Sequence, residues 1–543
     1  MSPRFLFLAA CACLGALAPA SDLRAQDTTA TRPGVRLGLN YPRGSVPRVI
    51  VLPVDTTPGD SVRAIIHRDL ENSDRVSPIP LDVVTLAGIT PAPGQDPNYE
   101  LFNKLGAAAI IQPRRAPNGG LRVALYDVGA KRRIEARDFP VATVPPVRDA
   151  SIRDSITAEA TLREKALRDS VTRVLRTRAA IMRRPPVRKV PRPRRFVVRD
   201  SLRRDSAATA YIRRGQNRWD EDRRDSVTLA ISTAAERLIR ADSAARVAAG
   251  DNERMSIHRV SDEVESWITG KRGIAATRIA YVHNGMIRIV DSDGENDRAV
   301  TSRGTAMSPA WHPNGRRIVY SRMSNAGTQI EQLDLESGSA RSMSPTGLNI
   351  TPVFSQDGRS IVYSNGDESG TDLLMVSADA ANGLMAPQRL TFGRGSDNNS
   401  PSFSPDGRQI AFISGRSRFP EVYTMDADGT NLQLLTPFIP GVRTYRTAPD
   451  WSPDGRTVAY EQQNGDFQVW MTNIRDKEPR RLTSEGENEG PSWAPDGRHL
   501  ALSSNRGGSK QIWVLDTESG RFRQLTRNAG ARLASWSPML NLK

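Results

Sequence analysis

The sequence predicts an all-β six-bladed β-propeller, preceded by a small α/β domain and interrupted by an inserted basic helical segment. Three observations predict this fold. A ten-residue motif, WSPDGRTVAY from Trp451, returns with small changes along the C-terminal half. Strand and helix patterns alternate over residues 47–140, and a stretch rich in Arg and Pro separates the two regions. A chain of 543 residues is also too long for one ordinary core, so we expect at least two folded domains.

Residues 1–25 are a predicted signal peptide. An arginine precedes the apolar run FLFLAACACLGALAPA, which is shorter than a membrane span, and small residues follow it. We favour cleavage after Ala25 and expect an exported, periplasmic protein. A lipoprotein box over residues 8–11, ending in Cys11, is the alternative. Both cysteines, Cys11 and Cys13, lie in this leader, so we expect no disulfide in the mature chain.

Residues 26–46 are predicted to be an extended segment that a partner could add to its sheet, with a disordered leader as the alternative. Residues 47–140 are predicted to form the small α/β domain. PRVIVLPVDTT from Pro47 is apolar and rich in β-formers. DSVRAIIHRDLENS places apolar residues on one helical face behind a cap at Asp60 or Ser61. An edge strand in RVSPIPL, then a helix and three more strands, complete the domain, in which no phosphate-binding loop occurs.

Residues 141–255 are the predicted insert. From residue 148 to residue 254 there are 27 Arg and Lys against 15 Asp and Glu, a surplus of 12 positive charges within a total of +16. Two helical patterns flank RRPPVRKVPRPRR, whose prolines exclude a helix and favour an extended spacer. Three uses remain open: a solvated hairpin with surface ion pairs, an arm that binds anionic polymer, and nucleic-acid binding. Aromatic residues do not interleave with the arginines, which disfavours nucleic acid.

A helix over residues 256–276 is predicted to lead into the propeller at residues 277–543. The opening aromatic residues of the repeats lie 42 to 49 residues apart, the length of one four-stranded blade. The aromatic residue leads an inner strand, Pro-Asp-Gly forms a tight turn, and alternating apolar residues form the next strand. The opening residues are Trp311, Phe354, Phe403, Trp451, Trp493 and Trp536.

The two ends of the repeat region predict the number of blades. The last copy, ASWSPML from Ala534, contains only a first strand. TRIAYVHNGMIRIVDSDG from Thr277 has the later strands without an opening motif. The two fragments complete one blade, the sixth, which closes the ring and removes the exposed sheet edges. Because turn and packing duties explain every residue of the repeated motif, we expect function to reside in the loops.

A signal peptide, RVIVLPV, IIHRDLENSDRVSPI, SDEVESWITGKRGIAATRIAYV and six repeats ending in ASWSPML follow one another along the chain. This order resembles the TolB family of the Tol-Pal envelope system, over residues 34–140 and 256–543; the insert departs from the family pattern. The resemblance implies a non-enzymatic periplasmic protein that docks the peptidoglycan-associated lipoprotein Pal through its propeller. It also implies that the extended N-terminal segment contacts an inner-membrane partner like TolA.

The resemblance further implies a partner-binding site at one mouth of the propeller channel. In the family this mouth is built by the loops just before each Pro-x-aromatic strand. Matching those loops in this chain gives Leu348 and Thr351 before Pro352, Asn399 and Ser400 before Pro401, and Asn488 and Glu489 before Pro491.

Enzymatic and metal-binding alternatives lack their motifs. No Gly-x-Ser-x-Gly elbow occurs, and the 5 histidines form no HExxH motif. Asp291, Asp293, Asp426 and Asp428 resemble the start of calcium loops whose later ligands are missing. We therefore expect no catalytic residue, no metal and no cofactor.

The sequence thus predicts a non-enzymatic scaffold that docks a Pal-like lipoprotein and does not span a membrane. The alternative is an exported envelope-binding protein that holds an anionic lipid or cell-wall polymer through the insert. Binding to a polymer through arginines should weaken steeply with salt, whereas a mostly uncharged contact at the channel mouth should not.

Overall fold

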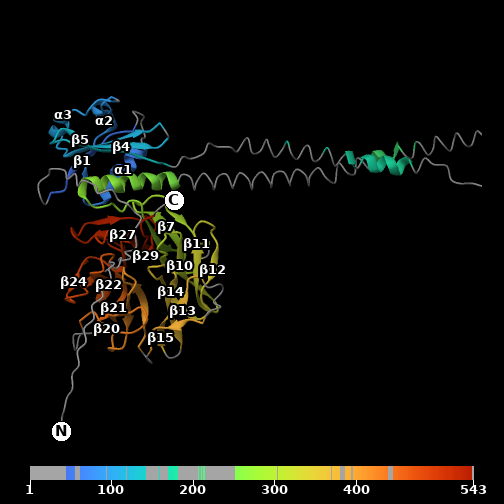
Figure 1. The fold of residues 1–543 in the computed structure, drawn as a ribbon. Coiled ribbons are helices and arrows are strands. Elements are labelled where there is room, and N and C mark those ends of the chain that lie inside the picture. Colours follow the sequence, from blue (N-terminus) through green and yellow to red (C-terminus); the bar gives the residue numbers. More distant parts are fainter. Residues whose placement is uncertain are drawn as a thin grey trace, which may run out of the picture. The chain divides into compact units, whose positions relative to one another are not determined.

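The structure, a computed structural model, contains one five-stranded sheet with helices and six four-stranded sheets (Figure 1). This confirms the predicted six-bladed propeller with a small α/β region before it. The predicted signal peptide, residues 26–44 and most of the insert lie outside the described residues. None of the described helices is both long and apolar enough to cross a membrane. The structure describes residues 45–54, 61–92, 94–117, 119–141, 251–302, 304–367, 370–379, 386–392, 396–437 and 444–540, with short helical stretches between 158 and 214.

The N-terminal sheet has the strand order β2-β1-β3-β4-β5. Strand β1 runs parallel to β2 and β3, whereas β3, β4 and β5 are antiparallel neighbours. The short β2 is the predicted edge strand. The strands are β1 (Arg48–Val51), β2 (Ser77–Pro78), β3 (Ala109–Arg115), β4 (Leu121–Asp127) and β5 (Arg132–Phe139).

Three labelled helices accompany this sheet: α1 (Ser61–Asn72), α2 (Val83–Ile89) and α3 (Tyr99–Lys104). Helices α1 and α3 agree with the sequence prediction. Helix α2 was not predicted, because it is short and its apolar residues show no long period. Its signal is the cap at Asp82, whose carboxylate accepts the N–H of Thr85 at 2.8 Å.

Both faces of the sheet are covered. Successive strand residues point to opposite sides, so Val49 and Ile111 join one core while Ile50 and Ile110 join the other. The first core is completed by α1 and by the helix that includes residues 251–269. The second is completed by α2 and α3. The chain therefore returns to the N-terminal sheet after the insert, before it enters the propeller.

The helix after the insert differs from the predicted span of 256–276. Residues 251–269 are helical, and the helix ends there because Gly270 adopts a left-handed backbone with φ of 74°. The following segment is tied back to the helix. The buried carboxylate of Asp262 accepts the N–H groups of Ala275 and Ala276 at 2.6 and 3.0 Å. This fixes the point at which the propeller begins.

The propeller contains six sheets of four antiparallel strands each. Five sheets are continuous in sequence, and in these the first strand is the innermost. The strands are β6 (Arg278–His283), β7 (Met286–Asp291), β8 (Arg298–Ala299), β9 (Ala306–Trp311), β10 (Arg317–Ser324), β11 (Gly327–Asp334), β12 (Ala340–Ser342), β13 (Leu348–Phe354), β14 (Ser360–Asp367), β15 (Gly370–Ser377), β16 (Gln388–Arg389), β17 (Asn399–Phe403), β18 (Gln409–Ser414), β19 (Glu421–Asp426), β20 (Gln433–Leu434), β21 (Tyr445–Trp451), β22 (Thr457–Asn464), β23 (Asp466–Asn473), β24 (Pro479–Arg481), β25 (Asn488–Trp493), β26 (His499–Ser504), β27 (Gln511–Asp516), β28 (Phe522–Gln524) and β29 (Arg532–Trp536).

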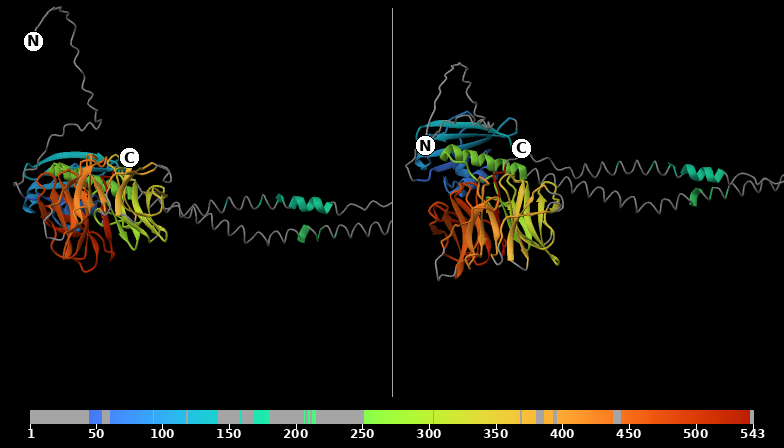
Figure 2. Two further views of the ribbon diagram at one scale, coloured as in Figure 1. Left: turned by 90° about the horizontal axis from the view of Figure 1, so that it is seen from below. Right: turned by 60° about the horizontal axis from the view of Figure 1, so that its bottom comes forward.

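The sixth sheet is shared by the two ends of the repeat region, as predicted. Strand β29 pairs antiparallel with β6, and Trp536 lies opposite Ile279. The indole N–H of Trp536 donates to the hydroxyl of Thr277 at 2.9 Å, and the N–H of Ser537 donates to the carbonyl of Arg278 at 2.8 Å. Strand β29 also contacts β25 and β9, the inner strands of both neighbouring blades. The ring is therefore closed by backbone pairing, and Figure 2 shows it from two further directions.

In each blade, a hydroxyl group just after the outer strand hydrogen-bonds to the third strand. In all six blades a Thr or Ser hydroxyl oxygen accepts the N–H of a residue in the third strand, at 2.9 to 3.2 Å. This bond supplies a buried N–H with a partner beyond the short outer strand. The hydroxyls belong to Thr301, Ser344, Thr391, Thr436, Thr483 and Thr526.

Candidate partner-binding site

Every innermost strand of the propeller contains a bulge just before its aromatic residue. The register of the strand shifts there in all six blades. One residue at each bulge has a left-handed backbone, with φ between 49° and 56°. This conformation costs a residue other than Gly about 1 kcal/mol or more, so the closed ring must hold it in place. The six bulge residues are Ser308, Thr351, Ser400, Ala448, Gly490 and Leu533.

The bulges surround a central cavity of about 450 Å3 to which all six blades contribute. Two predicted site residues, Thr351 and Ser400, are bulge residues in its wall. The hydroxyl oxygens of Thr351 and Ser364 lie 2.7 Å apart. The N–H of Ser400 lies 3.3 Å from the first oxygen and 3.2 Å from the second. These hydroxyls therefore link neighbouring blades as well as lining the cavity.

The predicted residues ahead of the bulges differ in exposure. Leu348 is exposed, and Asn399 and Glu489 are half-buried. Asn488 is fully buried: its amide N–H group donates to the side chain of Gln468 at 3.1 Å and to the carbonyl of Glu485 at 3.0 Å. Asn488 thus holds its loop in place. Of the other five predicted residues, Thr351 and Ser400 lie in the cavity wall, whereas Leu348, Asn399 and Glu489 precede the bulges and do not line the cavity.

The charged groups near Glu489 largely satisfy one another. The ammonium group of Lys510 lies 2.6 Å from the carboxylate of Glu489 and 3.2 Å from that of Glu487. Glu461 accepts the N–H of Gly490 at 2.6 Å, and burial raises the pKa of Glu461 to about 7. This part of the mouth consequently offers little net charge to a partner.

Four large apolar side chains are exposed at the same end of the propeller, and we call them the apolar rim. Their exposed fractions range from 48% to 70%. Tyr445 stands at the same distance from Pro449 as Leu348 does from Pro352, so the Pro-x-aromatic spacing could have identified it. Met323 lies near the end of β10 and Phe392 lies in a loop, and the Pro-x-aromatic spacing marks neither of them. The apolar rim consists of Met323, Leu348, Phe392 and Tyr445.

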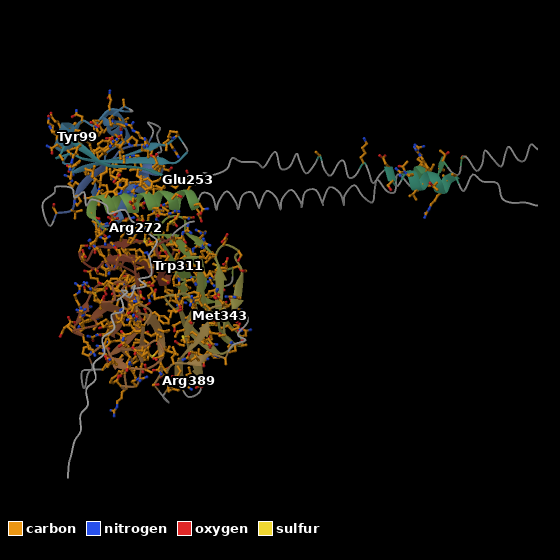
Figure 3. All side chains as sticks on the ribbon, viewed as in Figure 1. Tyr99, Glu253, Arg272, Trp311, Met343 and Arg389 are labelled. Carbon is orange, nitrogen blue, oxygen red and sulfur yellow. The ribbon has the colours of Figure 1, made fainter. Side chains whose placement is uncertain are left out.

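Strand pairing places the apolar rim at one end of the ring. Leu348 and Tyr445 begin inner strands and lie opposite Gly366 and Gln463, next to the hairpins that join the second and third strands. The N–H of Met323 donates to the carbonyl of Thr305, just before the inner strand β9. Arg389 stacks on Phe392 with 5.4 Å between guanidinium and ring centroid. In Figure 3, Arg389 lies at the end of the propeller away from Glu253 and Arg272, which mark the helix and the turn after it.

The opposite end of the propeller, formed by the Pro-Asp-Gly turns, contacts the N-terminal domain. Arg75, just after α1, lies 3.0 Å from Asp496 in one such turn and 3.2 Å from Glu265 of the helix. Asp291 and Asp293, which the sequence placed in a calcium-like loop, contact Arg254. These carboxylates therefore have arginine partners.

In the described part of the chain, two groups of His and Asp side chains each place three possible metal-ligand atoms close together. Both groups lie at this end of the propeller. Each group already contains carboxylates paired with arginines, as Asp516 is with Arg498 at 2.6 Å. In the second calcium-like sequence, the carboxylate of Asp428 already accepts hydrogen bonds from the N–H and the hydroxyl of Thr430, at 2.9 and 2.6 Å. The two groups are Asp69, His258 and Asp293, and Asp74, His499 and Asp516.

The chain thus forms a closed six-bladed propeller behind a small α/β domain, with an apolar rim exposed at one end. The chain belongs to the TolB family: the model described as TolB beta propeller domain matches residues 266–540. This confirms the family resemblance.

Curated relatives match a short part of the chain. The Tol-Pal system protein TolB of Haemophilus influenzae strain PittGG is 44% identical over 94 residues, which are 16% of this chain and 22% of that protein. The TolB protein of Legionella pneumophila strain Corby is 37% identical over 94 residues, with the same shares. The chain thus matches about a fifth of the length of these relatives.

One solved structure is similar over most of the chain. The crystal structure of TolB from Acinetobacter baumannii aligns with a TM-score of 0.61 and covers 91% of this chain and 97% of its own. The two sequences are 18% identical in that alignment, so this likeness concerns the fold alone.

Proposed function

We propose that this chain is a non-enzymatic periplasmic component of a Tol-Pal system and that it docks a Pal-like, peptidoglycan-associated lipoprotein at the apolar rim. Membership of the TolB family supports the system. The exposed apolar side chains at one end of the propeller support the docking surface. In this proposal the chain binds its partner and converts no substrate.

The apolar rim is the observation that carries the proposal. Large apolar side chains that gather on one surface mark a protein interface more often than scattered single ones do. Tyr445 and Phe392 are aromatic, the residue type that most often anchors protein contacts. Tyr445 is also held in place, because its ring lies 6.1 Å from that of Phe467 in an edge-on arrangement. A partner therefore meets a partly ordered surface and loses less conformational freedom on binding.

The bulge residues fit the same role as a second layer. Thr351 and Ser400 line the cavity behind the rim, with Asn399 beside them at the start of β17. A side chain of the partner that enters the cavity would meet hydroxyl groups and proline rings rather than unpaired charges. We propose that Leu348, Thr351, Asn399, Ser400 and Glu489 contribute to the contact and that Asn488 supports the loop from within.

The test is the affinity of the full chain for the Pal-like lipoprotein domain of the same envelope, measured by isothermal titration calorimetry. Leu348→Asp should weaken binding about tenfold or more, since it places a charge in an apolar contact. Leu432→Asp is the matched control, because Leu432 is 39% exposed but lies in the turn between β19 and β20, at the other end of the blade. Equal affinities for the two variants would rule out docking at the rim.

Removal of residues 142–250 distinguishes docking at the apolar rim from binding through the insert. The shortened chain should keep the affinity of the full chain. Binding should also weaken by less than about threefold between 0.1 and 0.5 M salt, since few exposed charges take part. A steep loss with salt, or loss of binding in the shortened chain, would favour an anionic polymer or an insert-mediated contact instead.

We also propose that the segment 26–46 contacts a TolA-like inner-membrane partner. The family resemblance supports this contact, and residues 26–44 lie outside the described residues. Crosslinking in envelope extract should capture that partner with the full chain and lose it when the segment is deleted behind an intact signal peptide. Retention of the partner by the deletion variant would contradict the proposal.

A further inference from the structure

The end of α1 and the turn after it, residues 69–75, contact the helix over 251–269 and the propeller, and we call this group of contacts the joint. Arg75 is bound by Glu265 and Asp496, as described above. Arg521 of the propeller lies 2.7 Å from the carboxylate of Asp74. The joint therefore brings together charged groups from the N-terminal domain, the helix over 251–269 and the propeller.

His258 lies in the middle of one side of the joint. It belongs to the helix and is fully buried. Its Nδ1 atom lies 2.8 Å from a carboxylate oxygen of Asp69 in α1. Its Nε2 atom faces the carboxylate of Asp291 in β7 at 3.9 Å and has no hydrogen-bond partner in the described part of the chain. The imidazole thus stands between an N-terminal carboxylate and a propeller carboxylate.

His499 occupies the same kind of position on the other side. It is the first residue of β26 and is also fully buried. Its Nδ1 atom lies 2.8 Å from the carboxylate of Asp496 in the propeller. Its Nε2 atom lies 3.3 Å from the carboxylate of Asp74 in the N-terminal domain. A neutral imidazole has one N–H, whereas a protonated one can donate toward both carboxylates.

We propose that the joint is proton-linked: protonated His258 and His499 each bridge a carboxylate of the N-terminal domain and one of the propeller, and loss of these protons loosens the joint. Both histidines are needed for the full effect because they occupy separate positions in the joint, His258 in the helix and His499 in β26. The link is a property of the contact between two domains, and it is independent of the docking surface at the far end of the propeller.

The charged neighbours favour the protonated imidazoles. Burial lowers the pKa of His258, but Asp69, Asp293 and Asp291 outweigh burial, so the pKa lies above its ordinary value. Burial also lowers the pKa of His499, and the hydrogen bonds and charges of Asp496 and Asp74 again outweigh it. The opposing positive charges already have carboxylate or carbonyl partners. They are Arg68, Arg254, Arg278 and Arg523 around His258, and Arg75, Arg498 and Arg521 around His499.

The direction of the pH effect follows from these shifts. A histidine in the separated domains has a pKa of about 6.5, and the joined form holds its proton more tightly. The stabilisation is therefore complete below about pH 6.5 and is lost as the pH rises through the pKa of the joined form. Two buried carboxyl groups of the helix act in the same direction, because they too bind a proton more tightly in the joint. Burial raises the pKa of Glu265 to about 7 despite Arg75, and burial together with the charge of Asp69 raises that of Asp262 to about 7.

The test is amide hydrogen exchange of the full chain between pH 6 and pH 8.5, corrected for the intrinsic pH dependence of exchange. Peptides from α1 and from residues 251–269 should lose protection as the pH rises, by up to about tenfold per histidine for each unit of pKa shift. Peptides from β22, the second strand of another blade, are the internal control and should keep theirs. A joint whose protection does not change with pH relative to β22 would overturn the proposal.

Variants assign the effect to the histidines. His258→Asn with His499→Asn should abolish the pH dependence that remains after Glu265→Gln is introduced, apart from the contribution of Asp262. His312→Asn is the matched control, because His312 is a buried propeller histidine that contacts Arg317 and the Gly358 carbonyl rather than two carboxylates. An unchanged pH dependence in the double variant would exclude the histidines.

Nuclear magnetic resonance of the imidazole Cε1–H groups tests the same point without relying on a variant that folds well. The chain has 5 histidines, so their signals can be resolved and assigned. Two should titrate above pH 6.5, and Asp69→Asn and Asp74→Asn should each bring one of them down. Midpoints at or below 6.5 for His258 and His499 would overturn the proposal.

Discussion

The two ends of the propeller are built from the same repeats but differ in the side chains that they carry: buried charged groups at the joint and exposed apolar groups at the rim. At the joint, the side chain of Arg75 is only 8% exposed and lies between two buried carboxylates. At the apolar rim, Leu348 and Tyr445 stand in solvent beside a mouth with little net charge. Removing one partner of a buried ion pair leaves an uncompensated buried charge, whereas covering an exposed apolar side chain is favourable. The joint thus contains buried, paired charges, whereas the rim exposes apolar side chains.

The largest expected effect on this difference between the two ends comes from removing the positive charge of Arg75 from the joint. Arg75→Met should lower the free energy of unfolding by about 3 to 5 kcal/mol, because Glu265 and Asp496 lose their shared partner. Urea unfolding measures it. Arg456→Met is the control, since Arg456 is 81% exposed, lies 3.9 Å from Asp454, and should change stability by less than about 0.5 kcal/mol. Similar losses in both variants would contradict a special role of the joint.

Acid should weaken the joint through Asp496. Burial opposes its ionisation, but the hydrogen bond from His499 and the charges of His499 and Arg75 lower its pKa to about 2. Because an unfolded Asp has a pKa of about 3.9, this stabilisation is present above pH 4 and is lost as the pH falls toward 2. It should amount to about 2 kcal/mol. In Asp496→Asn, urea unfolding between pH 2 and 5 should show a correspondingly shallower decline.

Substitution of Thr436 measures how much a buried hydroxyl group in the blade interior contributes to stability. This hydroxyl accepts the N–H of Val422 at 3.2 Å and donates to Glu421 at 2.7 Å. Thr436→Val keeps the shape but leaves buried polar groups without this partner, which should cost about 1 to 3 kcal/mol. Thr436→Ser, which retains the hydroxyl, should lose clearly less in the same urea experiment. An equal loss would point to the methyl group instead.

At the rim, we expect a substitution to lower partner affinity with little change in the free energy of unfolding. Tyr445→Ser removes an exposed ring and its edge-on contact with Phe467, so we expect a loss of less than about 1 kcal/mol in unfolding free energy. Partner affinity should nevertheless fall, as proposed for Leu348→Asp. A large loss of stability with unchanged affinity would show that Tyr445 serves the fold rather than the contact.

Much of the fold could be predicted from the sequence because its signals are local. The motif around Trp451 specifies a strand, a tight turn and a second strand within ten residues, and the incomplete copies near Thr277 and Trp536 give the number of blades. Helix α2 lacks such a period and was not predicted. The end of the helix after the insert at Gly270 was also placed too late, because apolar residues continue beyond it.

The candidate site was only partly predictable for a related reason. The Pro-x-aromatic spacing led to Leu348, Thr351 and Ser400 at the mouth and in the cavity wall. The same spacing also led to Asn488, which is buried because strand residues alternate between the blade interior and the mouth. Phe392 lies in a loop, and its exposure depends on how neighbouring blades leave it uncovered.

By itself the sequence determined the repeat, the closure of six blades and the family, because strand periods and turn residues act over a few positions. Only the tertiary structure decided which charges meet: His258 contacts Asp69 across 189 positions of the chain, and Arg75 contacts Asp496 across 421. Such contacts leave no period in the sequence, because they depend on how separately folded elements pack.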